Sequence, residues 1–154
     1  MGIVDRTNWT QVDMEFRHKL INEYNIKAVK FLQQLGEKVV KYARNDESSA
    51  RHYTDRTGNL RSSIGYVVVQ EGRVVAESFN GNNEGSTTGR KYAIDVASGL
   101  PKNKTYLVWV AGMDYARYVE AMGFDVIQGS GDWIESRADA EREAFKRYLN
   151  SNRR

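Results

Sequence analysis

The sequence predicts an α+β fold, in which a long N-terminal helix and a C-terminal helix pack on a small curved, mainly antiparallel sheet. Apolar residues recur every three or four positions over 12–44 and again over 133–149, which is typical of amphipathic helices. Between them, β-branched runs at 65–70 and 73–79 flank a short turn, as in a hairpin. A third run, 105–111, has the composition of a strand.

The composition indicates one globular domain spanning 1–154. Hydrophobic residues make up 40% of the chain and charged residues 28%, which separates it from disordered chains. The absence of cysteine excludes disulfide frameworks and thiolate metal sites. No apolar run approaches the ~20 residues of a membrane span, so we expect no membrane partner. The net charge of +3 is spread among mixed charges, which favours a solvated surface over a nucleic-acid surface.

The N-terminal part of the chain is predicted to be an arm followed by helix. Residues 1–11 are polar apart from Trp9, so we expect a flexible arm that orders on a partner. Asn25 is a candidate cap that divides the helical pattern into 12–24 and 26–44. The apolar stripe of this helical pattern contains Phe16, Leu20, Ile21, Tyr24, Ala28, Val29, Leu32, Leu35, Gly36, Val39, Val40 and Ala43.

A polar loop at 45–49 ends this helical pattern, and a short helical turn precedes the hairpin. The hydroxyl of Thr57 can cap that turn, and Leu60 and Ile64 lie on one face of it at i,i+4 spacing. The next two runs of β-branched residues are joined by Glu71-Gly72, which predicts a tight hairpin turn.

Residues 80–104 are rich in glycine and asparagine, so we expect a flexible insertion loop that orders against a neighbour, with a short ordered piece at 92–97. Within it, 85–91 has glycine and lysine at a spacing close to that of a phosphate-binding loop. It is one residue short and lacks the hydroxyl after the lysine, so phosphate binding is not expected. The run 105–111 is apolar on both faces and predicts a central strand.

The last third of the chain predicts a short helix, a strand and a final helix. Tyr115–Met122 is helical in pattern, with Gly123 as its C-terminal stop. Residues 124–128 are expected to form a last short strand, and Asp132 to cap a helix over 133–149. The apolar stripe of this helix contains Ile134, Ala138, Phe145 and Leu149.

No pattern of catalytic or metal-binding residues is present, so the chain is predicted to be non-enzymatic and without a cofactor. His18 and His52 are the only histidines, and neither lies in a triad or ligand pattern. The nine tyrosines and three tryptophans suit a core, subunit-interface anchors or base stacking, and the sequence leaves these three roles open.

Two motifs, in this order and spacing, resemble the tail-completion (head–tail connector, minor tail) protein family of long-tailed bacteriophages. The first motif contains Arg56, Thr57, Gly58, Asn59, Leu60, Arg61 and Ile64, and the second contains Tyr115, Ala116, Tyr118, Val119 and Glu120. Family members follow the second motif with an aromatic residue and a glycine, whereas Ala121-Met122-Gly123 stands here. From the residues themselves two arrangements stay open: the charges of Arg61 and Glu120 are exposed and independent, or the motifs pack together, within one subunit or across a ring joint, with Glu120 paired to Arg56 or Arg61.

The resemblance implies a non-enzymatic virion protein of the neck or tail, which assembles in the host cytoplasm. It implies a homomeric ring of about six or twelve copies that meets other neck, portal-adaptor or tail-terminator proteins. A tail terminator or head-closure adaptor is the alternative, followed by a small nucleic-acid-binding or enzymatic domain. A ring around the DNA path would make non-specific contact with DNA. The candidate DNA-facing residues are Arg142, Lys146, Arg147, Arg153 and Arg154.

Overall fold

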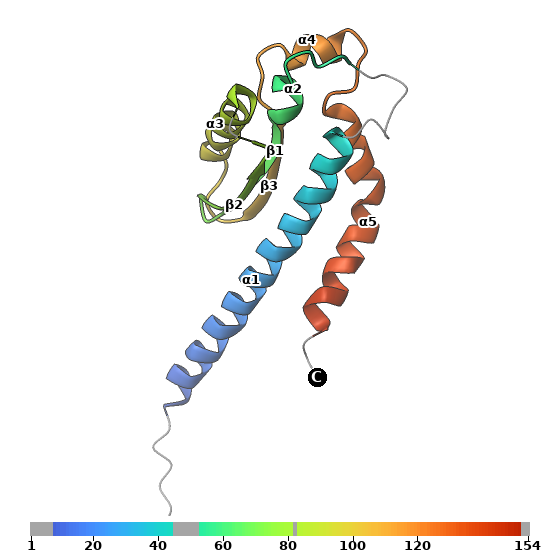
Figure 1. Cartoon of the computed structure of the whole chain (residues 1–154). Helices are drawn as coiled ribbons and strands as arrows, with labels where there is room; N and C mark the ends of the chain where they lie inside the picture. The colour runs from blue at the N-terminus through green and yellow to red at the C-terminus, as the bar shows by residue number, and fades with distance from the viewer. Residues whose placement is uncertain (1–7, 45–52, 82, 152–154) are drawn as a thin grey trace, which may run out of the picture.

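The computed structural model, which describes residues 8–44, 53–81 and 83–151, has the predicted α+β architecture (Figure 1). A long N-terminal helix and a C-terminal helix accompany a small antiparallel sheet with three shorter helices, one of which, α3, covers a face of the sheet. In chain order the elements are α1 Trp9–Arg44, α2 Asn59–Ser62, β1 Ile64–Gln70, β2 Arg73–Phe79, α3 Glu84–Ser98, β3 Thr105–Ala111, α4 Ala116–Ala121 and α5 Gln128–Asn150. The polar loop expected at 45–49 lies outside the described residues.

The predicted hairpin is confirmed as β1 and β2. Gln70 pairs with Arg73 across the turn, and the two turn residues Glu71 and Gly72 have φ angles of 51° and 76°. Positive φ at both positions is the geometry of the tight turns whose twist matches that of the flanking strands. A register shift at Val68/Val69 adds an irregularity to the β1–β2 ladder.

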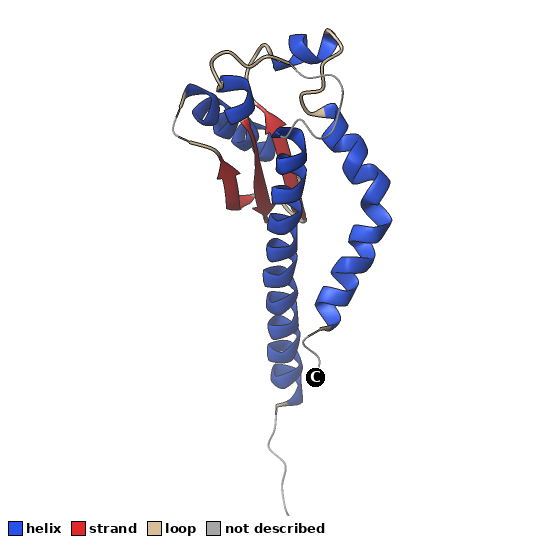
Figure 2. Cartoon of the chain, turned by 45° about the vertical axis from the view of Figure 1, so that its right-hand side comes forward, coloured by secondary structure: helices blue, strands red, loops and turns tan. Residues whose placement is uncertain are grey.

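The sheet has the order β2-β1-β3, so β1 is the central strand. The expectation that 105–111 is central is wrong, because β3 pairs only with β1. Its two apolar faces have a different cause: helices lie on both sides of the sheet (Figure 2). One face packs on α3, where Val67 and Val69 meet Ala93 and Ala97. An edge strand covered on both faces therefore has the apolar pattern of a central one.

The other face of the sheet packs on α1. Ile64, Tyr66 and Val68 of β1 share a buried cluster with Val40 of α1. The Tyr66 hydroxyl donates a hydrogen bond to the Glu37 carboxylate at 3.0 Å. The alternation of β1 residues between the two clusters follows the two-residue period of a strand, and it makes β1 the centre of the molecule.

The first helix is continuous over its 36 residues, about 54 Å in length. The predicted division at Asn25 is wrong, since one asparagine inside a helix costs only about 0.7 kcal/mol and strong helical sequence surrounds it. The expected arm is shorter than 1–11, because α1 begins at Trp9 and the Asn8 side chain accepts a hydrogen bond from the Gln11 backbone N–H at 3.2 Å. The remainder of the arm, 1–7, lies outside the described residues.

The flexible loop expected at 80–104 is wrong, because residues 84–98 form α3. The Asn83 side chain accepts a hydrogen bond from the Ser86 backbone N–H at 3.0 Å and caps the first turn of this helix. The sequence 85–91 is therefore helical and forms no phosphate-binding loop, and the short ordered piece expected at 92–97 is the last part of the same helix.

Two glycines of α3 serve close packing. A Cβ atom added at Gly89 would lie 2.2 Å from the Ser63 carbonyl oxygen, and one at Gly85 would lie 2.1 Å from the Asn59 carbonyl oxygen. These glycines stand four residues apart, on one face of the helix. They let the α3 backbone rest directly on α2, so the glycine content that suggested flexibility has a packing function here.

The connection after β3 departs from the prediction at one point. The predicted short helix is confirmed as α4, and Gly123 follows it with a φ of 90°. The strand expected at 124–128 is wrong, because this segment is irregular and leads into α5 at Gln128. The predicted cap Asp132 therefore lies inside α5.

The last helix packs antiparallel along the C-terminal half of α1. Near the start of α5, Trp133 stacks on Tyr42 with 5.3 Å between the ring centroids. Near its end, the Lys27 amino group donates to the Leu149 carbonyl oxygen at 3.1 Å. Figure 2 shows that α1 continues well beyond the point where α5 ends.

Candidate assembly surface

The two motifs singled out in the sequence meet in one buried cluster. Leu60 and Ile64 of the first motif are 2% and 0% exposed, and Ala116 of the second is 6% exposed in the same cluster. Val119 packs against this cluster from α4. Of the two arrangements left open by the sequence, the structure therefore has the motifs packed together, within one chain, and their apolar residues form part of the core.

Glu120 caps α5. One oxygen of its carboxylate accepts hydrogen bonds from the backbone N–H groups of Ile127 at 3.2 Å and Gln128 at 2.7 Å. The Asp125 carboxylate accepts a third, from Gly129 at 2.9 Å. Two carboxylates thus cover the positive end of the α5 dipole. Within one chain, this backbone contact takes the place of the arginine pair expected for Glu120.

The polar residues of the first motif shape the turn before β1. Gly58 precedes α2 with a φ of 72°, and the Thr57 hydroxyl accepts a hydrogen bond from the Asn59 backbone N–H at 3.3 Å. The backbone N–H of Arg61 donates to the Asp55 carboxylate at 2.7 Å. The Arg56 side chain is exposed. The motif is thus mainly a local folding unit that presents an arginine at the surface.

A small apolar patch lies on the outer side of α4. Tyr115, Tyr118 and Met122 are 40%, 75% and 70% exposed, whereas Ala116 on the inner side is buried. Exposed tyrosine and methionine side chains are enriched at protein interfaces. This patch is one candidate contact surface for another subunit.

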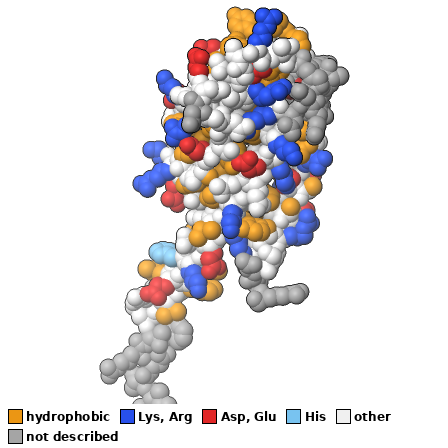
Figure 3. All heavy atoms as spheres, viewed as in Figure 1, with side chains coloured by type: hydrophobic (Ala, Val, Ile, Leu, Met, Phe, Trp, Pro, Cys, Tyr) orange, Lys and Arg blue, Asp and Glu red, His pale blue; other side chains and the backbone are white. Residues whose placement is uncertain are grey.

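The larger candidate surface is the part of α1 that projects past α5, residues 9–24, which we call the stem (Figure 1). Its exposed hydrophobic residues are Val12, Met14, Phe16, Leu20, Ile21 and Tyr24, with exposed fractions of 46%, 53%, 60%, 45%, 58% and 50%. Figure 3 shows hydrophobic side chains along this part of the molecule, among charged ones. Soluble monomers rarely leave such a set exposed together, so the stem has the character of an interface.

An apolar groove of about 620 Å³ runs between α1 and α5. Ala28, Phe31 and Leu35 of α1 and Ile134, Ala138 and Phe145 of α5 line it. At its end the Phe145 ring contacts both Phe31 and Tyr24, with centroid distances of 4.9 and 5.9 Å. The stem therefore starts where this groove ends.

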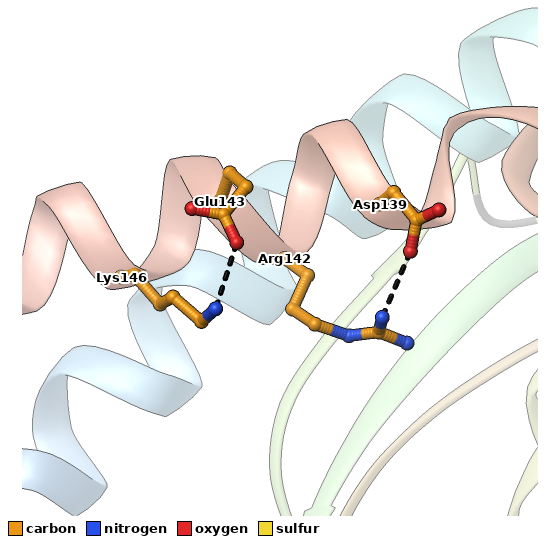
Figure 4. Close-up of polar contacts among 4 residues, drawn as sticks. All are labelled: Asp139, Arg142, Glu143 and Lys146. Atoms are coloured by element: carbon orange, nitrogen blue, oxygen red, sulfur yellow. Dashed lines mark hydrogen bonds and ion pairs between the residues drawn. The ribbon is translucent and has the colours of Figure 1, made fainter.

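Two of the candidate DNA-facing residues form ion pairs on the surface of α5 (Figure 4). Arg142 contacts Asp139 at 2.8 Å, and Lys146 contacts Glu143 at 2.7 Å. The Lys146 hydrogen bond and charge hold the pKa of Glu143 below its ordinary value. Exposed pairs of this kind are weak, so both cations stay available to a stronger anion. Arg147 is exposed in the last turn of α5, and Arg153 and Arg154 lie outside the described residues.

The described part of the chain contains no cluster of three or more histidine, cysteine or acidic residues that could hold a metal ion. His18 is exposed on the stem, and His52 lies outside the described residues. Among the helices described, none is long and apolar enough to cross a membrane.

Comparison of the chain with family models, curated proteins and solved structures finds no match. The periodicity of Phe16 and Leu20 predicts the helix that carries them, but it gives no sign that this part of the helix is exposed as the stem.

Proposed function

We propose that this chain is a structural virion protein of a long-tailed bacteriophage, a ring-forming tail-completion or head–tail joining subunit of the neck. The observation that carries the proposal is the stem, with six large hydrophobic side chains at 45–60% exposure along one projecting helix. A helix gains most of its stability from packing of its apolar side. Tyr24, at the end of the stem, packs on Phe145, whereas Val12, Met14, Phe16, Leu20 and Ile21 remain 45–60% exposed. A chain with such an exposed apolar helix is suited to assembly with other subunits.

The motif resemblance supports the phage assignment. Apolar residues of both motifs, Leu60, Ile64 and Ala116, are joined in one buried cluster, as expected of a structural unit that members share. In this proposal the chain has no catalytic activity. Its partners are further copies of itself and the adjoining neck, portal-adaptor or tail-terminator proteins, and its location is the virion after assembly in the host cytoplasm.

A tail terminator or head-closure adaptor has the same need for an assembly surface, and it is the second candidate. The exposed stem suits both candidates, so the position of the protein in the particle separates them. Contact with DNA through α5 is a further element of the proposal, and the candidate cations among the described residues are Arg142, Lys146 and Arg147.

The direct test is electron microscopy of phage particles that contain this chain with an epitope tag. We expect antibody label at the junction of head and tail, and a reconstruction with a closed ring of about six or twelve copies. Particles that lack the chain, or that hold only one or two copies of it, would contradict the proposed role. Label at the tail side of a completed junction would favour the tail terminator.

A further inference from the structure

We propose that the stem of one copy docks into the groove between α1 and α5 of the next copy, so that the ring closes through a contact between two different surfaces. This inference rests on the proposed function, and it names the surfaces that join the subunits. The occupant of the groove is a second copy of this chain.

The apolar surface of α1 is continuous from the groove into the stem. Tyr24 and Phe31 of α1 contact Phe145 of α5, and the hydrogen bond from Lys27 to Leu149 marks the end of α5 along α1. From Tyr24 toward the N-terminus, the apolar row continues in steps of four residues through Leu20, Phe16 and Val12. The helix surface that α5 covers in one half of α1 therefore continues uncovered in the other half.

The molecule carries two exposed apolar surfaces, the stem and the groove, which have Tyr24 in common. The groove lies beside the C-terminal half of α1 and the stem is its N-terminal part, so one copy can use both at once. Two different surfaces that fit each other produce a heterologous contact, and repetition of a heterologous contact generates a ring when the rotation closes. A helix laid into a groove is also a common mode of recognition.

The stem cannot occupy the groove of its own chain. Leu20 of the stem and Leu35 in the groove lie 15 residues apart on one continuous helix, about 22 Å along its axis. Since α1 has no interruption between them, the stem cannot fold back, and a second molecule has to supply the helix that fills the groove.

The charges of the two surfaces are complementary. The stem contains three acidic and two basic side chains, a formal excess of one negative charge with histidine neutral. The charged residues that border the groove are Lys104, Glu141 and Arg142, a formal excess of one positive charge. Glu141 is paired with Lys38 at 3.0 Å and Arg142 with Asp139 at 2.8 Å, so Lys104 supplies the excess positive charge, which favours an occupant with an excess of negative charge.

Cysteine cross-linking tests this contact directly, because the chain contains no cysteine of its own. Leu20→Cys is placed on the stem of one full-length chain, and Ala138→Cys in the groove of a second chain with a different affinity tag. We expect a mixture of the two, with a short flexible thiol cross-linker, to give mainly the mixed dimer. His18→Cys is the matched control, because His18 is exposed two residues from Leu20 and points to the opposite side of the helix.

Two outcomes of this experiment would overturn the docking. Leu20→Cys chains that cross-link mainly to each other would show a symmetric pairing of two stems. Equal cross-linking of Ala138→Cys with Leu20→Cys and with His18→Cys would show random collision, as would no cross-linking in any mixture. Selective cross-linking of the mixed pair supports the docking.

A complementation experiment adds a second measurement. Phe16→Asp blocks the stem, and Ala138→Glu blocks the groove with bulk and negative charge. We expect each variant to be monomeric by light scattering, and their mixture to form one-to-one dimers through the single intact stem and groove. His18→Asp adds the same charge as Phe16→Asp on the opposite side of the stem, and we expect it to assemble as the unmodified chain does. Variants that still form the full ring would refute the docking.

The two proposals fail in different ways. Rings at the phage neck that survive both Phe16→Asp and Ala138→Glu would remove the docking and leave the neck role intact. Selective cross-linking of a chain that is absent from phage particles would support the docking and remove the neck role.

Discussion

Replacement of Gly89 by alanine places a methyl group where α3 rests on α2. The new Cβ atom would lie 2.2 Å from the Ser63 carbonyl oxygen and 2.9 Å from two further backbone atoms of Ser63. Carbon and oxygen approach no closer than about 3.3 Å in ordinary contacts, so the two helices have to separate by about 1 Å. Overpacking of this kind costs about 1–3 kcal/mol. The cost should lie at the upper end of this range, because the opposing atoms belong to the backbone and cannot rotate away.

The higher helix propensity of alanine returns about 1 kcal/mol, which leaves a net loss of about 2 kcal/mol in the free energy of unfolding. For a chain of this length, that loss lowers the melting temperature by about 4–8 °C. Gly131→Ala is the matched control, because Gly131 lies inside α5 and no heavy atom lies within 4 Å of the added Cβ. There we expect a gain of about 0.5–1 kcal/mol.

Urea unfolding followed by tryptophan fluorescence measures both variants, with the midpoint converted to free energy through the slope. Gly89→Ala should lower the free energy of unfolding, and Gly131→Ala should raise it. If Gly89→Ala is as stable as the unmodified chain while Gly131→Ala gains stability, α3 does not press on α2 as described. Such a result would restore the interpretation of 80–104 as a flexible segment.

Three further predictions concern single side chains. Burial, followed by the hydrogen bond to Glu37, raises the pKa of Tyr66 to about 12, so its contribution to stability is complete below pH 10 and is lost as the pH rises toward 12; Tyr66→Phe should lower the free energy of unfolding in urea by about 1 kcal/mol near neutral pH and reduce the loss between pH 10 and 12. Glu120→Ala should destabilise by about 1–2 kcal/mol in the same assay through loss of the α5 cap, whereas Glu120→Gln, which keeps an acceptor oxygen, should retain part of it; equal losses would contradict the capping role. If α5 of the assembled ring contacts DNA, replacing Lys146 and Arg147 by glutamine should lower the salt slope of duplex binding by about 2, and a ring that binds no duplex at low salt would remove DNA contact from the proposal.

The strands and the hairpin could be predicted because their signals are local. Runs of valine and the Glu71-Gly72 pair determine strand and turn within a few residues of each other. The start of α5 could not be predicted in the same way. Of its two capping carboxylates, Asp125 lies four residues before Gly129 and acts locally, whereas Glu120 lies seven and eight residues before Ile127 and Gln128 and reaches their N–H groups only because the chain turns back after α4. A search limited to residues at the helix start therefore selects Asp132.

Glycine content and apolar periodicity are each compatible with two different structures, and only the fold shows which one is present. Gly85 and Gly89 suggested a loop, yet their missing side chains allow two helix backbones to touch. Phe16 and Leu20 have the period of a core-facing helix, but periodicity does not show where the covering helix ends. The helix lengths show the difference: α1 has 36 residues and α5 has 23, so most of the stem extends beyond the end of α5.

Because α1 is uninterrupted, a rotation of the subunit body also moves the tip of the stem. Its C-terminal half is held against the sheet through Tyr66 and through the Arg44 guanidinium, whose Nε donates to the Ile64 carbonyl oxygen at 3.1 Å. The stem extends about 24 Å from that support, so a tilt of about 10° in the sheet moves the tip by about 4 Å. A neighbouring subunit bound to the tip would therefore be displaced when the subunit body rotates, and this coupling favours tilting of neighbouring bodies in the same direction.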